Sequence, residues 1–164
     1  MESFEIILER YEKEMSEADK EHWITKKNEI YKALLKNMSP ADLSLEVKET
    51  LDGLRESGHK LAIGSSSKNA RFILGQLGLG EYFDAISDGN NISKSKPDPE
   101  VFVKAAEYIE EAQKHCLVVE DAEAGLKAAI AGGMDCAAIG DAVGCGLGTY
   151  NLATFSDLLK VVEN

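Results

Sequence analysis

The stretch LVVEDAEAGLKAAIAGG, residues 117–133, decides the fold class of this chain. Three apolar residues run directly into two acids, Glu120 and Asp121, and a helix-like segment follows. A short apolar run followed by a helical pattern is typical of a buried strand and its crossover helix, the unit of a parallel sheet. Ligands in such folds bind outside the carboxyl ends of the strands, so the two acids predict a bound cation there.

Length and composition indicate a folded protein with one domain, or one domain plus a small insert. The chain has 164 residues, 44% of them hydrophobic, and carries a formal charge of −11 with a pI of about 4.7. This acidity argues against nucleic acid and anionic membranes as partners, because both would repel it. The acidic balance suggests a soluble protein and gives no information about the fold.

The cysteines and the N-terminus point to the cytoplasm. Cys116, Cys136 and Cys145 are odd in number and form no CxxC pair, so disulfides are not expected. Cys116 and Cys136 lie in apolar runs and are expected to be core thiols. The first residues, MESFEIILERYEKEM, are acidic and amphipathic, unlike a signal peptide. No apolar stretch approaches the roughly 20 residues that a membrane span needs.

The chain has two parts, with the boundary at residues 37–43 (NMSPADL). Residues 1–38 are expected to form a helical cap segment of two antiparallel amphipathic helices, and residues 39–164 an α/β core. The apolar positions of the first helix are Phe4, Ile7, Leu8, Tyr11 and Met15. Those of the second are Trp23, Ile30, Tyr31, Leu34 and Leu35.

Helices and short apolar strands alternate after residue 44, which predicts a doubly wound parallel sheet. The predicted strands are residues 59–64, 85–87, 116–120, 136–139 and 153–155. Helices are expected at residues 45–57, 68–77, 122–131 and 156–162, with one more that Asp98 caps and Pro99 begins.

Polar residues follow three of these strands. The segment SSSKN, residues 65–69, leads into a helix and could cradle an anion or simply cap that helix. Lys96 lies in a polar loop before Pro97, which favours an extended conformation for the lysine. Asp121 could cap the next helix, but that leaves Glu120 unexplained, whereas Mg²⁺ prefers hard oxygen ligands of this kind.

Taken in order, Ser65, Lys96 and the Glu120–Asp121 pair resemble the second, third and fourth motifs of the haloacid dehalogenase superfamily of phosphotransferases. Three segments are similar to its β-phosphoglucomutase-like branch, and the helical segment with TKKN (25–28) and SPADL (39–43) extends the resemblance over nearly the whole chain. The three segments are LAIGSSSKN (61–69), SKPDPEVF (95–102) and LVVEDAEAGLKAA (117–129).

The resemblance implies Mg²⁺-dependent phosphoryl transfer on a sugar phosphate through an aspartyl-phosphate. Its closest form is the interconversion of β-glucose 1-phosphate and glucose 6-phosphate. It implies that Ser65 and Lys96 hold the transferring phosphoryl oxygens, and that Glu120 and Asp121 hold Mg²⁺ directly or through water. It further implies that the substrate's other phosphate is bound by Ser67, Lys68 and Asn69. Lys27 corresponds to a lysine of the cap that faces the site.

The superfamily's first motif, DxDG followed by Thr or Val, is absent from the sequence. That motif carries the nucleophilic Asp and the acid/base Asp, on a central strand between those predicted here at 59–64 and 116–120. The resemblance therefore implies two unpaired strand edges and a chain that is inactive by itself. A truncated record, a separate partner segment and a true loss all remain open.

Several alternatives stand beside the mutase. A sugar-phosphate phosphatase shares the same machinery, and a non-catalytic fragment could keep only the phosphate and Mg²⁺ sites. A receiver-type signalling domain needs its acid pair near the first strand and its lysine late, which is the reverse of the order here. GCGLG, residues 144–148, lacks the GxGxxG spacing of a nucleotide-binding loop. The expected partner is a sugar phosphate, and the complete protein is expected to be a monomer.

Overall fold

The computed structural model describes residues 15–163, and the chain divides into two compact units, residues 1–38 and 39–164. The predicted first helix, with Phe4, Ile7, Leu8 and Tyr11, lies outside the described residues except for Met15.

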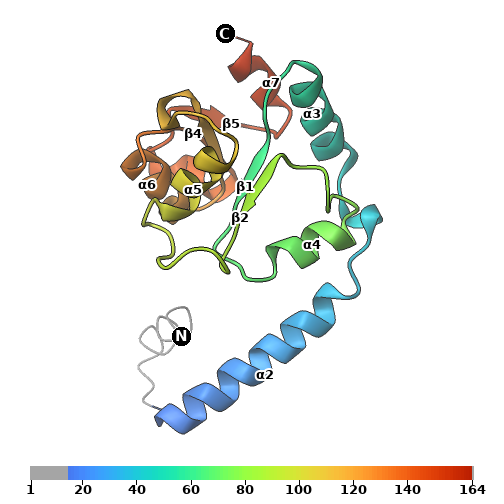
Figure 1. Ribbon diagram of the computed structural model, residues 1–164, viewed down its shortest axis with the longest axis vertical. Coiled ribbons are helices and arrows are strands. Elements are labelled where there is room, and N and C mark those ends of the chain that lie inside the picture. Colours follow the sequence, from blue (N-terminus) through green and yellow to red (C-terminus); the bar gives the residue numbers. More distant parts are fainter. Residues whose placement is uncertain (1–14, 164) are drawn as a thin grey trace. The chain divides into compact units, whose positions relative to one another are not determined.

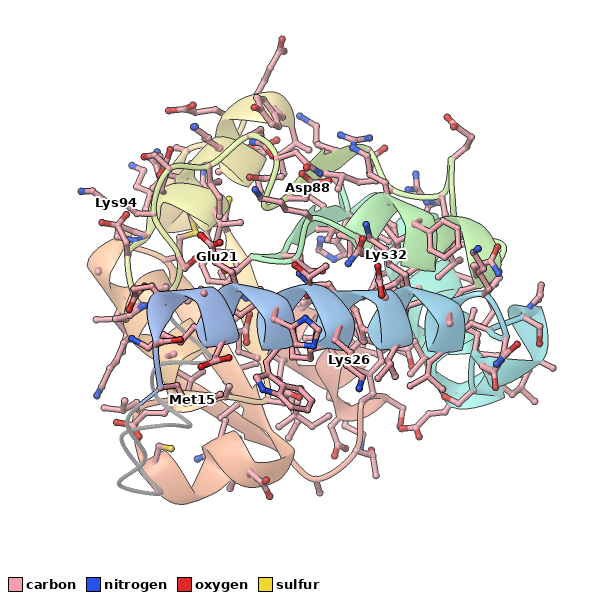
Figure 2. All side chains as sticks on the ribbon, turned by 90° about the horizontal axis from the view of Figure 1, so that it is seen from below. Met15, Glu21, Lys26, Lys32, Asp88 and Lys94 are labelled. Carbon is pink, nitrogen blue, oxygen red and sulfur yellow. The ribbon has the colours of Figure 1, made fainter. Side chains whose placement is uncertain are left out.

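The described part of the first unit is the helix α2, Glu17–Leu35. Ser16 caps it by accepting a hydrogen bond from the Asp19 amide at 3.2 Å, so the predicted second helix is confirmed. Glu21, Lys26 and Lys32 are spaced along it in Figure 2. Of the apolar residues predicted for this helix, Leu35 is buried, and the others are exposed: Trp23, Ile30, Tyr31 and Leu34.

The second unit contains two parallel sheets rather than one, and their strands are short. The first pairs β1 (Ala62–Gly64) with β2 (Ala85–Ser87). The second has β4 (Asp135–Ile139) in its centre, between β3 (Leu117–Glu120) and β5 (Tyr150–Leu152). The predicted parallel α/β fold is thus confirmed, and β1 and β3 are not hydrogen-bonded to each other, in agreement with the two unpaired strand edges expected above.

Helices cover both faces of the second sheet. Successive side chains of β4 point to opposite faces, so alternate residues of this strand pack against different helices. Cys136 and Ala138 pack with α5 and α6, whereas Ala137 packs with Leu54 and Leu158 of α3 and α7. Figure 1 shows α5 beside α6 and α3 beside α7. The helices are α3 (Leu45–Glu56), α4 (Ala70–Gln76), α5 (Glu100–Tyr108), α6 (Glu123–Ala131) and α7 (Asp157–Val162). Short 3-10 helices span Pro40–Asp42, Gln113–His115 and Gly140–Cys145.

The last strand is three residues earlier than predicted, and the prediction of residues 153–155 is wrong. Thr154 donates from its backbone amide and its hydroxyl to the Asp157 carboxylate, at 3.1 and 3.2 Å, so it is tied to the first residue of α7 instead of extending a strand. Tyr150 and Asn151, which do form β5, are exposed and follow no apolar pattern.

Other boundaries differ by a few residues from those predicted. β1 begins at Ala62 rather than His59, and α4 begins at Ala70 rather than Lys68. The N-cap of α5 is Pro99 rather than Asp98, although the Asp98 carboxylate accepts a hydrogen bond from the Glu100 amide at 3.0 Å. Cys116, Cys136 and Cys145 are free thiols.

No helix within residues 15–163 is both long enough and apolar enough to cross a bilayer.

Candidate active site

The loop after β1 holds the first predicted site residue. Ser65 is half-buried, and its amide donates to the carbonyl of Ser87 at 3.0 Å, one residue beyond the register of β1 with β2. Its Oγ accepts a hydrogen bond from the Ser67 amide at 3.2 Å. A hydroxyl has one proton to donate, so this contact leaves the Ser65 proton available to a ligand.

The rest of this loop, residues 66–69, is shaped by local bonds and by a neighbouring loop. Ser67 Oγ accepts from the Asn69 amide at 3.1 Å, while Lys68 is exposed. The loop after β2 crosses it so closely that a Cβ on Gly89 would lie 2.4 Å from the Ser66 carbonyl oxygen. The Asn69 side chain makes no capping hydrogen bond to α4.

Lys96 and Glu120 meet as an ion pair between the loop after β2 and the carboxyl end of β3. Both side chains are largely buried, with exposed fractions of 18% and 11%. Lys96 Nζ also lies 4.6 Å from the centre of the Phe102 ring, so the ammonium is held from two directions. The Lys96–Pro97 peptide bond is cis.

These contacts bring the carboxyl ends of β1 and β3 to the same region. A Cβ on Gly64, the last residue of β1, would lie 2.5 Å from the Phe102 ring, and Lys96 lies over that ring. Ser65 follows Gly64 directly, and Glu120 pairs with Lys96. Ser65, Lys96 and Glu120, predicted from three separate motifs, are therefore linked through one chain of contacts around Phe102.

Glu120 is also fixed by α6. A Cβ on Gly125 would lie 2.2 Å from the Glu120 carboxyl carbon, so only glycine leaves room for this carboxylate. Asp121 is exposed, and no hydrogen bond or ion pair joins it to any residue within 15–163. It does not cap α6, whose N-cap is Ala122.

The chemistry of this acid pair fits a magnesium ion in part. Asp121 offers a free carboxylate, and Glu120 offers a second one that Lys96 already neutralises. Mg²⁺ commonly takes one or two protein carboxylates and completes its coordination shell with water and phosphate, so this pair suits it. Within the described part of the chain there is no cluster of three or more His, Cys, Asp or Glu side chains that could hold a metal alone.

Glu100 anchors the loop that carries Lys96, and sequence reasoning did not single it out. Its carboxylate accepts hydrogen bonds from the Ser93 amide and hydroxyl and from the Lys94 amide, at 2.8–2.9 Å. Lys104 donates to the same carboxylate at 2.7 Å. Lys104 foremost, and then Ser93 and Lys94, lower the pKa of Glu100 to about 2. An acid in the first turn of a helix after a polar loop is the signal that could have identified it.

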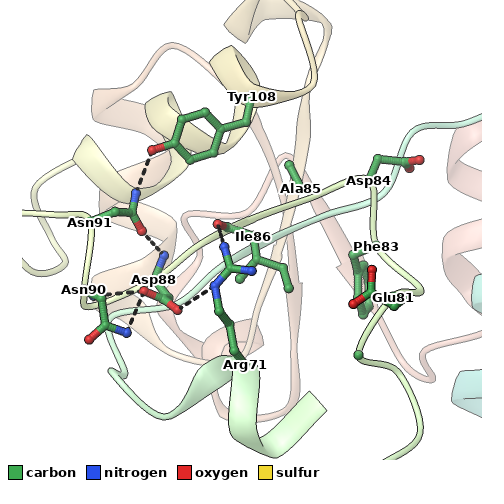
Figure 3. A pocket seen from close by; sticks show the side chains of 11 residues that line it. Arg71, Glu81, Phe83, Asp84, Ala85, Ile86, Asp88, Asn90, Asn91 and Tyr108 are labelled. Atoms are coloured by element: carbon green, nitrogen blue, oxygen red, sulfur yellow. Dashed lines mark hydrogen bonds and ion pairs between the residues drawn. The ribbon is translucent and has the colours of Figure 1, made fainter. Parts of the chain in front are cut away.

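A separate hollow of about 490 Å³ lies along the outer edge of β2 (Figure 3). Asp88 is buried there at 2% exposure, and its carboxylate accepts hydrogen bonds from the backbone and side chain of Asn90 at 2.9 and 3.0 Å. Arg71 pairs with Asp88 at 3.4 Å and donates to the Ile86 carbonyl at 3.1 Å. These contacts hold the loop after β2, while the buried Asp88 Oδ2 has the ion pair with Arg71 and no hydrogen bond.

Lys27 lies on α2 in the first unit and is exposed. Its role at the site remains a prediction, as do the ligand-binding roles of Ser67, Lys68 and Asn69.

Comparison with known protein families gives one match, to the haloacid dehalogenase-like hydrolases, over residues 2–139. Among characterised relatives, the β-phosphoglucomutase of Bacillus subtilis is 35% identical over 135 residues, covering 82% of this chain and 60% of the relative. The fructose-1-phosphate phosphatase of Escherichia coli is 35% identical over 102 residues, covering 62% of this chain and 53% of the relative. The chain thus spans about 60% or less of the length of these two relatives.

Among solved structures, a β-phosphoglucomutase from Clostridium difficile superimposes with a TM-score of 0.88 at 27% identity. The match covers 99% of this chain and 74% of that one.

Proposed function

Because the chain belongs to the haloacid dehalogenase-like hydrolase family, we propose that it carries the phosphate- and magnesium-binding side of a sugar-phosphate phosphotransferase. For the whole protein the proposed activity is the interconversion of β-glucose 1-phosphate and glucose 6-phosphate. The observation that carries the proposal is the buried Lys96–Glu120 pair, which lies where the carboxyl ends of β1 and β3 come together.

Lys96 and Ser65 have the chemistry to hold a transferring phosphoryl group. Phosphoryl transfer depends mostly on positioning and on neutralising the equatorial oxygens. The ammonium of Lys96 is fixed by Glu120 and by the face of Phe102, so it loses little freedom when it receives an anion. The Ser65 hydroxyl has its acceptor side occupied by the Ser67 amide and its proton free to donate.

Asp121 would hold Mg²⁺, with Glu120 beside it acting directly or through water. When bound, the ion neutralises charge on the transferring phosphoryl group. Asp121 suits this role because it is exposed and free of protein partners within residues 15–163.

According to the resemblance to the superfamily, the nucleophilic Asp belongs to the first-motif strand, and that motif is absent from this sequence. Within the described residues, Glu120 is the one carboxylate in contact with Lys96. We therefore expect no turnover from this chain alone.

A sugar-phosphate phosphatase is the second candidate, because relatives of both kinds match at similar identity. Besides the fructose-1-phosphate phosphatase, a phosphorylated carbohydrates phosphatase of Thermotoga maritima is 29% identical over 139 residues. Mutase and phosphatase differ in whether a sugar hydroxyl or water accepts the phosphoryl group.

The proposal is tested by calorimetric titration of the chain with β-glucose 1-phosphate, with and without Mg²⁺. We expect binding that depends on Mg²⁺ and weakens at least about tenfold in Asp121→Asn, because the loss of one carboxylate ligand removes an ionic contact. Asp135→Asn is the matched control. Asp135 is also exposed, but it begins β4 and so lies at the end of the sheet opposite to the carboxyl ends of the strands. Equal binding by both variants would contradict the metal assignment.

Substrate choice is tested by the same titration with fructose 1-phosphate, and by turnover assays with a trace of glucose bisphosphate. Tighter binding of β-glucose 1-phosphate supports the mutase, and tighter binding of fructose 1-phosphate supports the phosphatase. Turnover by this chain alone would refute the assignment of the nucleophile to another segment.

A further inference from the structure

Residues 87–90, which run from the end of β2 into the loop that follows it, are bonded to the loop of residues 65–69 at three points. Each point is a hydrogen bond to the backbone of that loop, and together they extend from its first residue to its fourth. The bonds run from Ser65 N to Ser87 O (3.0 Å), from Gly89 N to Ser67 O (3.2 Å) and from Asn90 Nδ2 to Lys68 O (3.1 Å). One short segment therefore sets the course of the loop to which phosphate binding is assigned.

Two of these bonds fix the peptide groups on either side of Lys68. The peptide bond between Ser67 and Lys68 is trans, so its C=O and N–H point in opposite directions. Because the Ser67 carbonyl is turned toward Gly89, the Lys68 amide points away from that neighbouring loop. Within the described part of the chain this amide has no hydrogen-bond partner, so it is an unused donor.

A single buried carboxylate, that of Asp88, is joined to both sides of this arrangement (Figure 3). Its Oδ1 accepts hydrogen bonds from the backbone and side-chain amides of Asn90, at 2.9 and 3.0 Å. Its Oδ2 lies 3.4 Å from Nε of Arg71, which belongs to the first turn of α4, the helix that the loop of residues 65–69 enters. Asp88 is thus linked to the middle of that loop through Asn90 and to its far end through Arg71.

The burial of Asp88 is unfavourable for stability by itself. Its Oδ2 makes no hydrogen bond, and the side chain of its ionic partner Arg71 is 65% exposed. A buried carboxylate with an incomplete set of hydrogen bonds destabilises a fold, and an apolar side chain of similar volume often costs less at such a position. The carboxylate does supply a fixed acceptor for Asn90, whose amide would otherwise be free to turn away from Lys68.

We propose that Asp88 is a positioning residue for phosphate binding. Through Asn90 it holds the Lys68 amide in the orientation in which this N–H donates to a phosphate oxygen, and it touches no ligand itself. A loop that is already ordered loses less conformational freedom when it binds a ligand, and the difference appears as affinity. The inference rests on the proposed function, since it assigns a support to the loop that would bind the sugar phosphate.

The test is calorimetric titration of variants with β-glucose 1-phosphate in the presence of Mg²⁺. Asn90→Ala removes the bond to the Lys68 carbonyl and should weaken binding about threefold to tenfold, the effect of losing one hydrogen bond. Asp88→Ala removes the acceptor that fixes Asn90 and should weaken binding at least as much. Asn151→Ala is the matched control, because Asn151 is also exposed but lies on β5, and it should bind like the wild type.

Two further readouts separate positioning from a general loss of structure. Amide exchange at Ser67 and Asn69 should become about tenfold faster in Asn90→Ala, while exchange in β4 should not change. Asp88→Asn keeps a side-chain oxygen that can accept from Asn90, so it should recover most of the affinity lost in Asp88→Ala. Where circular dichroism shows that Asp88→Ala does not fold, Asn90→Ala decides, because Asn90 is exposed.

The outcomes distinguish this inference from the proposed function. Wild-type affinity in both Asn90→Ala and Asp88→Ala would overturn the inference alone, as would unchanged amide exchange in the loop. An equal loss of affinity in Asp88→Asn and Asp88→Ala would also overturn it, because Asp88 would then not act as an acceptor for Asn90. Absence of binding by the wild type would refute the proposed function, and the inference with it.

Discussion

The loops after β1 and after β2 both lead into the candidate site, but they are held in different ways. The loop after β2, residues 88–99, is fastened from outside by α5, through Glu100, Lys104 and Tyr108. The loop after β1, residues 65–69, is held by its own hydroxyls and by its neighbour. The two loops therefore differ in preorganisation. Lys96 lies on a loop that is already fixed, whereas the exposed Lys68 side chain can adjust to a ligand.

The largest expected effect comes from the point where the two loops cross. In Gly89→Ala, the new Cβ would lie 2.4 Å from the Ser66 oxygen and 2.8 Å from the Lys68 nitrogen, both backbone atoms that cannot rotate away. We expect the free energy of unfolding to fall by about 1–3 kcal/mol, as for other overpacked sites. Urea unfolding measures it.

Gly144→Ala is the control for this crossing, because a Cβ there has nothing within 4 Å. If both variants were equally stable, the two loops would not be in the close contact described.

A smaller effect is expected where Glu120 meets α6. Alanine at Gly125 would displace the Glu120 carboxylate, which can move because it is the end of a flexible side chain. The steric cost is partly offset by the better helix propensity of alanine, so we expect a net loss of about 1 kcal/mol. Gly75→Ala in α4, with open space around the Cβ, should be neutral or stabilising.

The structural consequence of Gly125→Ala is the sharper readout. A crystal structure of the variant should show Glu120 turned away from Lys96. An unchanged ion pair would mean that α6 does not position Glu120.

Low pH should loosen the loop after β2, because Glu100 then becomes protonated. Its pKa is lowered from an ordinary 4.5 to about 2, so its stabilising contribution is complete above pH 4.5 and is lost as the pH falls toward 2. In Glu100→Gln this part of the acid dependence should be missing, and the amides of Ser93 and Lys94 should exchange about tenfold faster.

The pH comparison must allow for Asp157, whose pKa is also lowered to about 2, by Lys160 above all. Its contribution is common to the wild type and the variant, so the difference between their pH profiles isolates Glu100. Identical profiles would show that Glu100 does not anchor the loop.

The smallest effect on stability is expected at Lys68. Because the side chain is exposed, Lys68→Ala should change the free energy of unfolding by less than about 0.5 kcal/mol. Binding of a sugar phosphate should nevertheless weaken. A large loss of stability would mean that the loop after β1 is as firmly held as its neighbour.

The sequence predicted the features that depend on local pattern. The β-α alternation, the strand at residues 85–87, the positions of Ser65 and Glu120 at strand ends and that of Lys96 in the loop after β2 all follow from apolar runs interrupted by polar residues. Tyr150–Leu152 could not be found in this way, because a strand with exposed polar residues has no apolar signature. Glu100 carried only the weak signal of an acid in the first turn of a helix after a polar loop. The burial of Asp88 depends on contacts across loops, which no local pattern encodes.

Cys116 gives the second unit a chemical reporter of its own. It directly precedes β3, and burial raises the pKa of its thiol. Since the thiolate is the reactive form, alkylation of Cys116 at neutral pH should be slow while the start of β3 keeps its structure. The labelling rate of this one sulfur would then count the molecules in which that end of the sheet has opened, without any assay of catalysis.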